Sequence, residues 1–184
     1  MTIKDLLQQV RKPTVTLLDA AMAYAELGWH VFPLRPKGKI PLLSGKGFHD
    51  ATNDSAVVRR WWREHPTANI GGVPGKSGLV VLDIDGPAGE QTLTDLKLGA
   101  VRTLSAKTGR RDGGRHLWFK HPGGAIGNRK LAPYIDVRAD GGYVVLPPSV
   151  HPSGAVYSWS DATSIAALPK KLHAMYDAQP SVSA

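Results

Sequence analysis

The chain contains no cysteine, which excludes disulfide bonds, thiolate chemistry and cysteine-based zinc sites. It also lacks an apolar run long enough to cross a bilayer, and residues 1–18 lack the apolar core of a signal peptide. Hydrophobic residues make up 42% of the chain and charged residues only 21%, which excludes a wholly disordered protein. We therefore expect a soluble, cytoplasmic protein without a membrane partner, in which oxygen or imidazole ligands hold any metal and no zinc site exists.

Acidic residues are also scarce. The chain has 15 Asp and Glu against 23 Lys and Arg, which gives a net charge of +8. The basic residues gather in three segments, at residues 35–39, 59–63 and 107–115. Such a balance favours a polyanionic partner, either nucleic acid or nucleotide phosphates. A generally basic, soluble surface is the alternative interpretation.

The length of 184 residues is that of one ordinary domain with a real core. We expect an N-terminal arm over residues 1–14, the folded domain over 15–177 and a linker-like tail over 178–184. Hydrophobic periodicity and turn residues predict helices over residues 16–27, 54–64, 87–98 and 164–177. They predict strands over residues 29–34, 68–73, 78–85, 101–106, 116–120, 134–138, 143–146 and 156–159. This order favours an α+β or mixed α/β fold.

Residues 79–86, with the sequence LVVLDIDG, are typical of a strand that ends in a turn. Side chains on a strand alternate between faces, so Asp83 and Asp85 point the same way while Leu82 and Ile84 point into the core. The two carboxylates lie about 6.5–7 Å apart along the strand, and both can reach one divalent cation or a pair of cations. Neighbouring carboxylates repel, and a metal relieves that repulsion. A strand end where Asp-Gly opens a turn is the alternative.

Two further segments carry polar groups on predicted strands. Residues 113–119 combine a glycine pair with Arg115 and His116, which are donors suited to phosphate oxygens. A hydrogen-bonded structural histidine is the alternative for His116. Asp136 lies between apolar residues and shares a strand face with Arg138. The two residues could form a mutual ion pair. Alternatively, Asp136 is a third metal ligand and Arg138 a cation that binds phosphate.

Several other motifs have structural explanations. The segment Gly75-Lys76-Ser77 is not a P-loop, because the required first glycine is replaced by Ile70 and a strand follows instead of a helix. We interpret it as a hairpin loop between two neighbouring strands. The Trp61–Trp62 pair has helical spacing that favours core packing over base stacking. Ser149 lies in a proline-bounded loop and is a further candidate for nucleotide binding.

Taken in order, these pieces resemble the bifunctional primase–polymerase (Prim-Pol) domain of the archaeo-eukaryotic primase superfamily, found in phage and plasmid replication proteins. The resemblance runs from about residue 20 to residue 159. It includes GWHVFPL at 28–34, KIPL at 39–42, the tryptophan helix, NIG at 69–71 and GGYVV at 141–145. The three signatures of the family are an acidic pair on a strand, a small-x-His motif and a later acidic residue after an apolar one. They are matched by Asp83 with Asp85, by Gly114-Arg115-His116 and by Ile135-Asp136.

This resemblance implies an α+β fold: a primase-like catalytic core with a mixed, largely antiparallel sheet and an RRM-like half, a small N-terminal α/β unit, and flanking helices. It implies that Asp83, Asp85 and Asp136 hold two divalent ions, Mg²⁺ or Mn²⁺, which activate the primer 3′-hydroxyl and neutralise the triphosphate. By the same resemblance, His116 contacts the phosphates of the incoming nucleotide. The helpers implied for nucleotide binding are Arg115, Lys107, Arg138 and Ser149.

The resulting hypothesis is a DNA primase–polymerase that joins NTPs or dNTPs on a single-stranded DNA template, in the bacterial host cytoplasm if phage or plasmid encoded. A replicative helicase, fused or separate, is a candidate partner. The zinc stem of some relatives is absent, and an excised domain and a stand-alone primase both remain open. A non-catalytic single-stranded DNA-binding module is the main alternative, and a metal-dependent nuclease is the third.

Overall fold

The structure is a computed structural model that describes residues 1–45 and 47–178, and its strands form two sheets. The smaller sheet is antiparallel and contains β1 (Val31–Leu34), β2 (Asn69–Gly72) and β8 (Val144–Leu146), with β2 in the middle. The larger sheet has the order β6-β7-β3-β5-β4-β9, and β10 pairs with β5. Its pairs are antiparallel except for β5 with β10. The expected α+β fold with a mixed, largely antiparallel sheet is confirmed.

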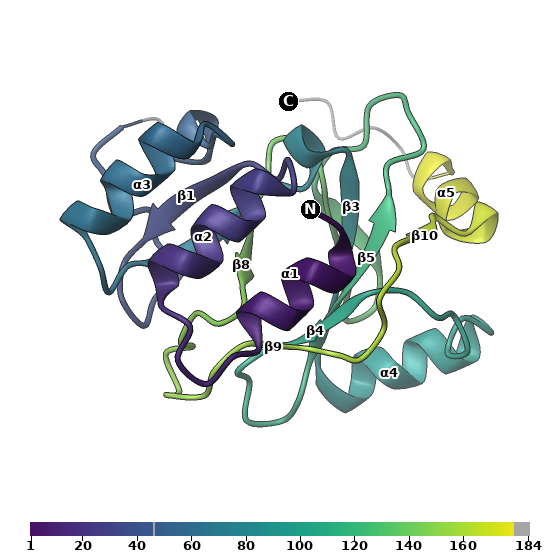
Figure 1. Cartoon of the computed structure of the whole chain (residues 1–184). Coiled ribbons are helices and arrows are strands. Elements are labelled where there is room, and N and C mark those ends of the chain that lie inside the picture. Colours follow the sequence, from purple (N-terminus) through teal and green to yellow (C-terminus); the bar gives the residue numbers. More distant parts are fainter. Residues whose placement is uncertain (46, 179–184) are drawn as a thin grey trace.

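The strands of the larger sheet are β3 (Leu79–Ile84), β4 (Ser105–Lys107), β5 (Arg115–Lys120), β6 (Arg129–Ala132), β7 (Ile135–Arg138), β9 (Ser158–Trp159) and β10 (Ala166–Ala167). The helices are α1 (Ile3–Val10), α2 (Leu17–Glu26), α3 (Ser55–Glu64), α4 (Gly86–Asp95) and α5 (Lys170–Asp177). Two short 3-10 turns, η1 (Gly47–Asp50) and η2 (Gly75–Ser77), complete the described elements. Figure 1 shows α2 and α3 on the side of the smaller sheet, α1 in front of the middle of the molecule, and α4 and α5 beside the larger sheet.

Local sequence signals explain where the N-terminal helices begin. Thr2 and Thr16 each form a capping box, with Asp5 and Asp19 respectively, and this satisfies backbone donors at the starts of α1 and α2. The Asp54 carboxylate caps α3 by accepting hydrogen bonds from the backbone of residues 56 and 57 at 2.8 and 3.1 Å. The predicted helix over 54–64 is thereby confirmed. Trp61 and Trp62 are buried, as core packing requires.

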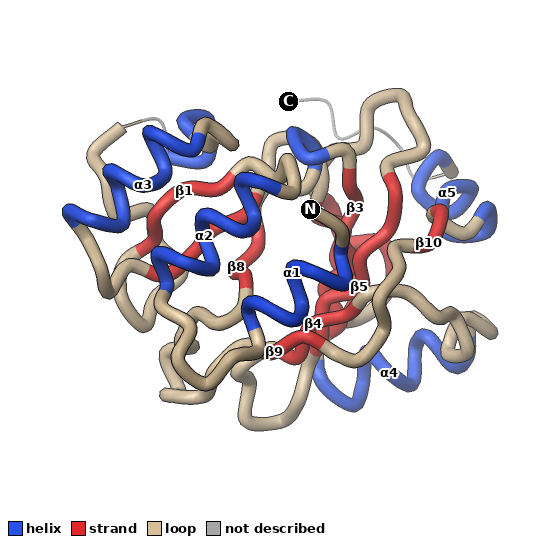
Figure 2. The backbone as a smooth tube through the Cα atoms, in the orientation of Figure 1, coloured by secondary structure: helices blue, strands red, loops and turns tan. Residues whose placement is uncertain are grey.

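Because side chains alternate along β3, this strand contributes to two hydrophobic clusters, one on each face of the larger sheet. Leu79 and Val81 pack with the helices and strands of the N-terminal half, and Val80, Leu82 and Ile84 pack on the other side with Leu93 of α4 and Leu172 of α5. These sets do not mix, because successive side chains on a strand leave opposite faces. The larger sheet, in which β3 lies between β7 and β5, therefore separates the two clusters. Figure 2 shows the path of its strands.

Four aromatic residues join the N-terminal half to the larger sheet. Trp29, just before β1, stacks on Trp118 of β5 with ring centroids 4.7 Å apart and planes 10° apart. Tyr24 of α2 stacks on the other side of Trp29 at 5.5 Å. The Trp159 indole N–H donates a hydrogen bond to the Tyr24 hydroxyl, which itself donates to the Pro147 carbonyl. These contacts hold the N-terminal half, with α2 and β1, against the larger sheet.

The predicted hairpin between residues 68–73 and 78–85 is wrong, because β2 and β3 belong to different sheets. The connecting turn η2 leads from one sheet to the other. The Lys76 ammonium donates to the carbonyls of His49 and Ala51, and the Ser77 hydroxyl donates to the Val73 carbonyl. The Gly-Lys-Ser side chains therefore anchor this crossover.

Smaller departures concern the later part of the chain. The strands β6 and β10 were not expected, and the last helix begins at Lys170 instead of near residue 164. Residues 166–167 pair with β5, and Pro169 occupies the N-cap position of α5. Beyond Ala178, the predicted linker-like tail lies outside the described residues.

Candidate active site

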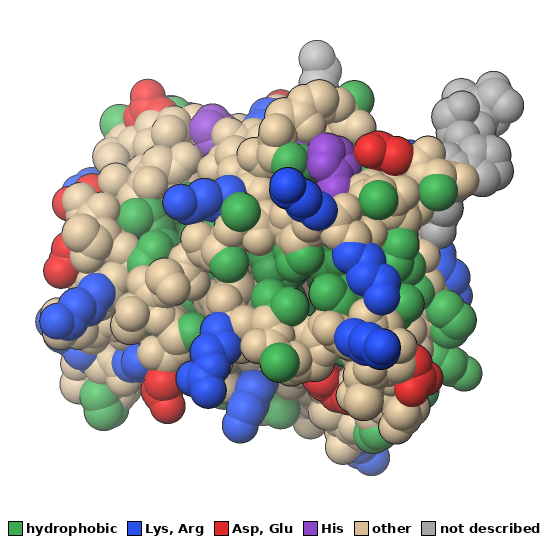
Figure 3. Space-filling view, turned by 90° about the vertical axis from the view of Figure 1, so that its right-hand side faces the viewer, with side chains coloured by type: hydrophobic (Ala, Val, Ile, Leu, Met, Phe, Trp, Pro, Cys, Tyr) green, Lys and Arg blue, Asp and Glu red, His purple; other side chains and the backbone are tan. Residues whose placement is uncertain are grey.

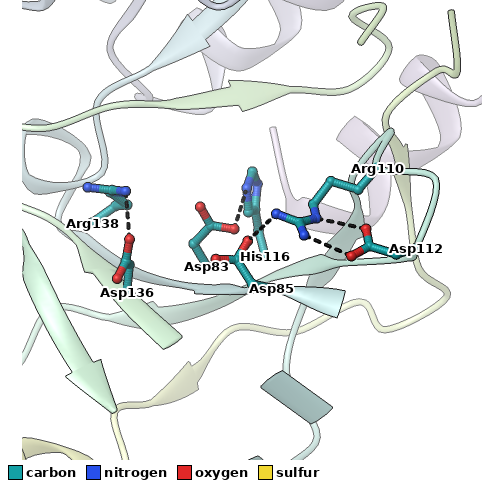
Figure 4. Close-up of polar contacts among 7 residues, drawn as sticks. All are labelled: Asp83, Asp85, Arg110, Asp112, His116, Asp136 and Arg138. Atoms are coloured by element: carbon teal, nitrogen blue, oxygen red, sulfur yellow. Dashed lines mark hydrogen bonds and ion pairs between the residues drawn. The ribbon is translucent and has the colours of Figure 1, made fainter. Parts of the chain in front are cut away.

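Three neighbouring strands of the larger sheet place the main predicted site residues in one row. Asp83 of β3 lies directly opposite His116 of β5 on one side and opposite Asp136 of β7 on the other. Residues paired in this way project from the same face of a sheet, and Asp85, two residues after Asp83, follows the same alternation. Figure 4 shows these side chains along the sheet. We call Asp83, Asp85, Asp136 and His116 the acidic row.

The centre of the acidic row is a contact between Asp83 and His116. The His116 Nε2 atom lies 3.4 Å from an Asp83 carboxylate oxygen, and His116 is only 5% exposed. Burial raises the pKa of Asp83, but the His116 hydrogen bond and the charges of His116, Arg138 and Lys39 outweigh it, so the pKa lies below its usual 3.8. Asp83 is therefore ionised at neutral pH.

The other ring nitrogen of His116 has no hydrogen-bond partner. Nδ1 is buried, and none of the residues in the described part of the chain bonds to it. Because Nε2 faces the carboxylate, the neutral ring carries its proton there and leaves Nδ1 as an acceptor, whereas the protonated ring donates from both nitrogens. Leaving a buried polar atom unsatisfied costs free energy, so this nitrogen is a position at which a ligand can bind.

The two outer carboxylates of the row are each paired with an arginine. Asp136 contacts Arg138 at 2.9 Å, which is the ion pair that strand alternation allows. Asp85 contacts Arg110 at 2.8 Å. The Arg110 guanidinium also binds Asp112 with two hydrogen bonds at 2.8 and 3.0 Å, and these raise its pKa more than burial lowers it. Each carboxylate of the row thus has its own partner, an arginine for Asp85 and Asp136 and the His116 ring for Asp83 (Figure 4).

The carboxylates of the acidic row are suitable ligands for a hard divalent cation, but in this structure each of them contacts a different partner: His116, Arg110 or Arg138. Carboxylate oxygens are the ligands that Mg²⁺ and Mn²⁺ prefer. Among residues 1–45 and 47–178, no three Asp, Glu, His or Cys side chains are grouped so that they could hold a metal ion. Ion binding at the row therefore requires the carboxylates to converge from these separate pairs.

A cavity of about 350 Å³ lies against the acidic row, within the size range of small-molecule sites. Asp83, His116 and Arg138 line it from the larger sheet. The opposite wall comes from residues of the smaller-sheet side: Lys39, Phe48 and residues 141–145. The cavity therefore lies between the two sheets, with carboxylate and imidazole on one side and Lys39 across from them.

Tyr157 completes the cavity wall beside His116. Its ring centroid is 6.3 Å from that of His116. Burial and the negative charge of Asp83 raise the pKa of Tyr157 to about 12. The hydroxyl therefore keeps its proton at neutral pH and is available as a hydrogen-bond donor.

The structure places three other predicted nucleotide-binding residues away from this cavity. Arg115 and Lys107 are cross-strand partners on the face opposite to His116, and Arg115 makes a bidentate ion pair with Glu90 of α4 at 2.6 and 2.8 Å. Both line a separate groove beside α4. Ser149 is fully buried, and its hydroxyl accepts a hydrogen bond from the Ile70 backbone at 2.8 Å.

Sequence reasoning did not assign roles to Lys39, Arg110 or Tyr157. Lys39 was noticed only in a basic segment and in the KIPL segment of the resemblance, and Arg110 only in a basic segment. Nothing local reveals that Lys39 lines the cavity and that Arg110 binds Asp85. Tyr157 leaves the same face of the sheet as Trp159, which pairs with Ala106, and Ala106 in turn pairs with His116. The tyrosine two residues before Trp159 on a predicted strand is the one signal of this position in the sequence.

The fold and site together define a two-sheet α+β domain with a row of three carboxylates and a histidine at an inter-sheet cavity. Over residues 21–171 the chain matches the model of a protein family described as bifunctional DNA primase/polymerase, N-terminal (Prim-Pol). The chain belongs to this family, and the expected resemblance is confirmed. The family is one of nucleotidyltransferase-type DNA primases and polymerases, which act on DNA and nucleotides.

No curated protein sequence matches the chain significantly. None of the helices within residues 1–45 and 47–178 combines the length and the apolar character that a bilayer crossing requires. On the face drawn in Figure 3, Lys and Arg side chains are spread widely over the surface. This distribution agrees with the net charge of +8 and with a polyanionic partner.

Proposed function

We propose that this chain is a metal-dependent DNA primase–polymerase that joins nucleotides on a single-stranded DNA template, in the replication of phage or plasmid DNA. The observation that carries the proposal is the register across β7, β3 and β5, which aligns Asp136, Asp83 and His116 on one face beside a cavity. A protein that only binds DNA gains nothing from carboxylates that repel phosphates. The acidic row therefore favours catalysis over binding alone.

The residues around the cavity divide into two groups. Asp83, Asp85 and Asp136 would hold Mg²⁺ or Mn²⁺. When bound, these ions supply activation of the primer 3′-hydroxyl and charge neutralisation of the triphosphate. Lys39 and Arg138 bring positive charge to the cavity, and both act electrostatically on Asp83. They are placed to bind nucleotide phosphates.

His116 and Tyr157 would position the nucleotide from the side of the larger sheet. The Asp83 carboxylate fixes the orientation of the His116 ring through Nε2. In the protonated ring, Nδ1 donates to a phosphate oxygen, and this contact satisfies the buried atom. The protonated Tyr157 hydroxyl supplies a second donor beside it. We assign no nucleotide contact to Arg115, Lys107 or Ser149, because their side chains are engaged or directed elsewhere.

The test is nucleotide incorporation by the full chain on a single-stranded template, with labelled nucleotides and Mg²⁺ or Mn²⁺, with and without a primer. Asp83→Asn should reduce incorporation more than about 100-fold, because the central carboxylate of the row loses its charge. DNA affinity should stay the same or rise, since one repulsive charge is removed. The control is Asp95→Asn, on the exposed side of α4, which should keep full incorporation.

The outcomes separate the candidate functions. Products without a primer identify a primase, extension only with a primer identifies a polymerase, and shortened template identifies a nuclease. DNA binding by the wild-type chain without incorporation in either metal identifies a binding module and contradicts the proposal. Equal incorporation by Asp83→Asn and wild type would remove the catalytic assignment of the acidic row.

A further inference from the structure

The turn between β6 and β7 holds an exposed tyrosine in a strained backbone conformation. Tyr134 has a φ of +60°, a region that bulky residues rarely adopt, and it is 54% exposed. Pro133 precedes it, and the order Pro then positive φ is that of a type II turn, in which glycine usually takes the second position. Strain of this kind persists where the surrounding structure enforces it, and it gathers at functional sites.

Backbone contacts fix this turn beside the acidic row. The Asp85 N–H donates a hydrogen bond of 2.9 Å to the Tyr134 carbonyl, so the turn is bound directly to a member of the row. Gly89 of α4 packs so closely that a Cβ atom there would lie 2.8 Å from the same carbonyl oxygen. Tyr134 also lies two residues before Asp136. The turn that carries the ring is therefore held at a defined position next to the site.

Lys130 adds a positive charge to the same place. It lies directly opposite Asp136 in the register of β6 and β7, so it extends the row by one strand on the same face. Lys130 is exposed, and its ammonium group has no partner among the residues that the structure describes. Lys130 and Tyr134 line one shallow depression of about 680 Å³, together with the residues between them.

We propose that Lys130 and Tyr134 form a contact site for single-stranded DNA beside the acidic row. An unpaired base stacks on the Tyr134 ring, and Lys130 contacts a neighbouring phosphate. An aromatic face next to an exposed cation is the combination by which proteins hold single strands without reading their sequence. The site lies at the free edge of the sheet, where a strand leaving the catalytic cavity has room. This inference rests on the proposed function, since it supplies the path of the DNA past the site.

The test is the affinity of the full chain for a fluorescein-labelled oligothymidine, measured by anisotropy in EDTA across a series of salt concentrations. Tyr134→Gly should weaken binding about tenfold at every salt concentration, since the stacking surface is lost. Tyr134→Phe should bind like wild type. Lys130→Gln should weaken binding and make the slope of log K against log salt shallower by about 0.7, the value for one phosphate contact on a single strand.

Thermal unfolding separates this role from a structural one. Because glycine relieves the positive φ, Tyr134→Gly should unfold at the same temperature as wild type or higher, although it binds DNA more weakly. The control is Val156→Ala, at an equally exposed apolar residue, which should leave DNA affinity unchanged. Unchanged affinity in Tyr134→Gly overturns the contact site and leaves the proposed function standing. Absence of DNA binding by the wild-type chain overturns both.

Discussion

At the scale of single residues, each carboxylate of the acidic row already has a polar partner. Asp83 contacts His116, Asp85 contacts Arg110, and Asp136 contacts Arg138. Without such partners, three neighbouring carboxylates would repel one another and destabilise the sheet. The partners therefore allow the chain to fold before any ion binds, and an incoming divalent ion competes with the two arginines.

Arg110 gives the clearest test of this competition. In Arg110→Gln, Asp85 loses its partner, so we expect Mn²⁺ to bind about three- to tenfold more tightly, in keeping with the modest energy of a partly exposed ion pair. The measurement is titration of free Mn²⁺ by electron paramagnetic resonance. The matched control is Arg111→Gln, which removes the same charge from the exposed neighbouring residue. An equal gain in both variants would show that only net charge matters and would contradict the role of the pair.

At the scale of elements, helix α4 is positioned by the close approach of Gly89. A Cβ atom at this position would lie 2.8 Å from both the Ile84 side chain and the Tyr134 carbonyl. Gly89→Ala should therefore destabilise the protein by about 1–2 kcal/mol. Overpacking costs about 1–3 kcal/mol and exceeds the gain in helix propensity of up to about 1 kcal/mol.

Urea denaturation measures this difference. Gly99→Ala is the control, because a Cβ atom there would meet only ordinary contacts, at 3.6 Å or more. It should change the free energy of unfolding by less than about 0.5 kcal/mol. If Gly89→Ala were as stable as wild type, α4 would not be held against the β6–β7 turn in the way described.

The elements also show what the sequence could and could not predict. The strand with Asp83, the N-cap at Asp54 and the buried Trp61–Trp62 pair follow from local periodicity and capping, and the structure has all three, with Asp85 just after the strand at the N-cap of α4. The hairpin between β2 and β3 failed because pairing depends on distant strands, which a local pattern of turn residues does not contain. The short strand β10 was missed for the same reason, because it pairs with the distant β5, whereas β6 was missed although it pairs with the adjacent β7.

Within the site, the separation of Arg115 from His116 follows from the sequence alone. Arg115 and His116 are neighbours on a strand, so they must leave opposite faces, and a cavity contact for His116 excludes one for Arg115. The structure accordingly pairs Arg115 with Glu90 on the side of α4. The contact between Arg110 and Asp85 was not predictable in this way, because it joins a loop to a strand 25 residues away.

At the scale of the whole molecule, the aromatic stack at Trp29 couples the two halves. Trp29→Ala removes a buried indole that stacks on Tyr24 and Trp118, and we expect it to lower the free energy of unfolding by about 3–5 kcal/mol. Trp29→Phe keeps an aromatic ring and should lose markedly less. Chemical denaturation followed by far-UV circular dichroism tests this, and equal stability of the two variants would contradict the coupling role of the stack.

The position of the cavity between the sheets has a consequence for dissecting the protein. A fragment that starts at β3 would keep all four members of the acidic row, yet it would lose Lys39, Phe48 and the strand β2 that pairs with β8. Such a truncation would retain the reactive groups but leave the opposite wall of the cavity incomplete and its strand β8 without a partner. Minimal versions of this domain must therefore include the N-terminal half, although none of the family's three signatures lies there.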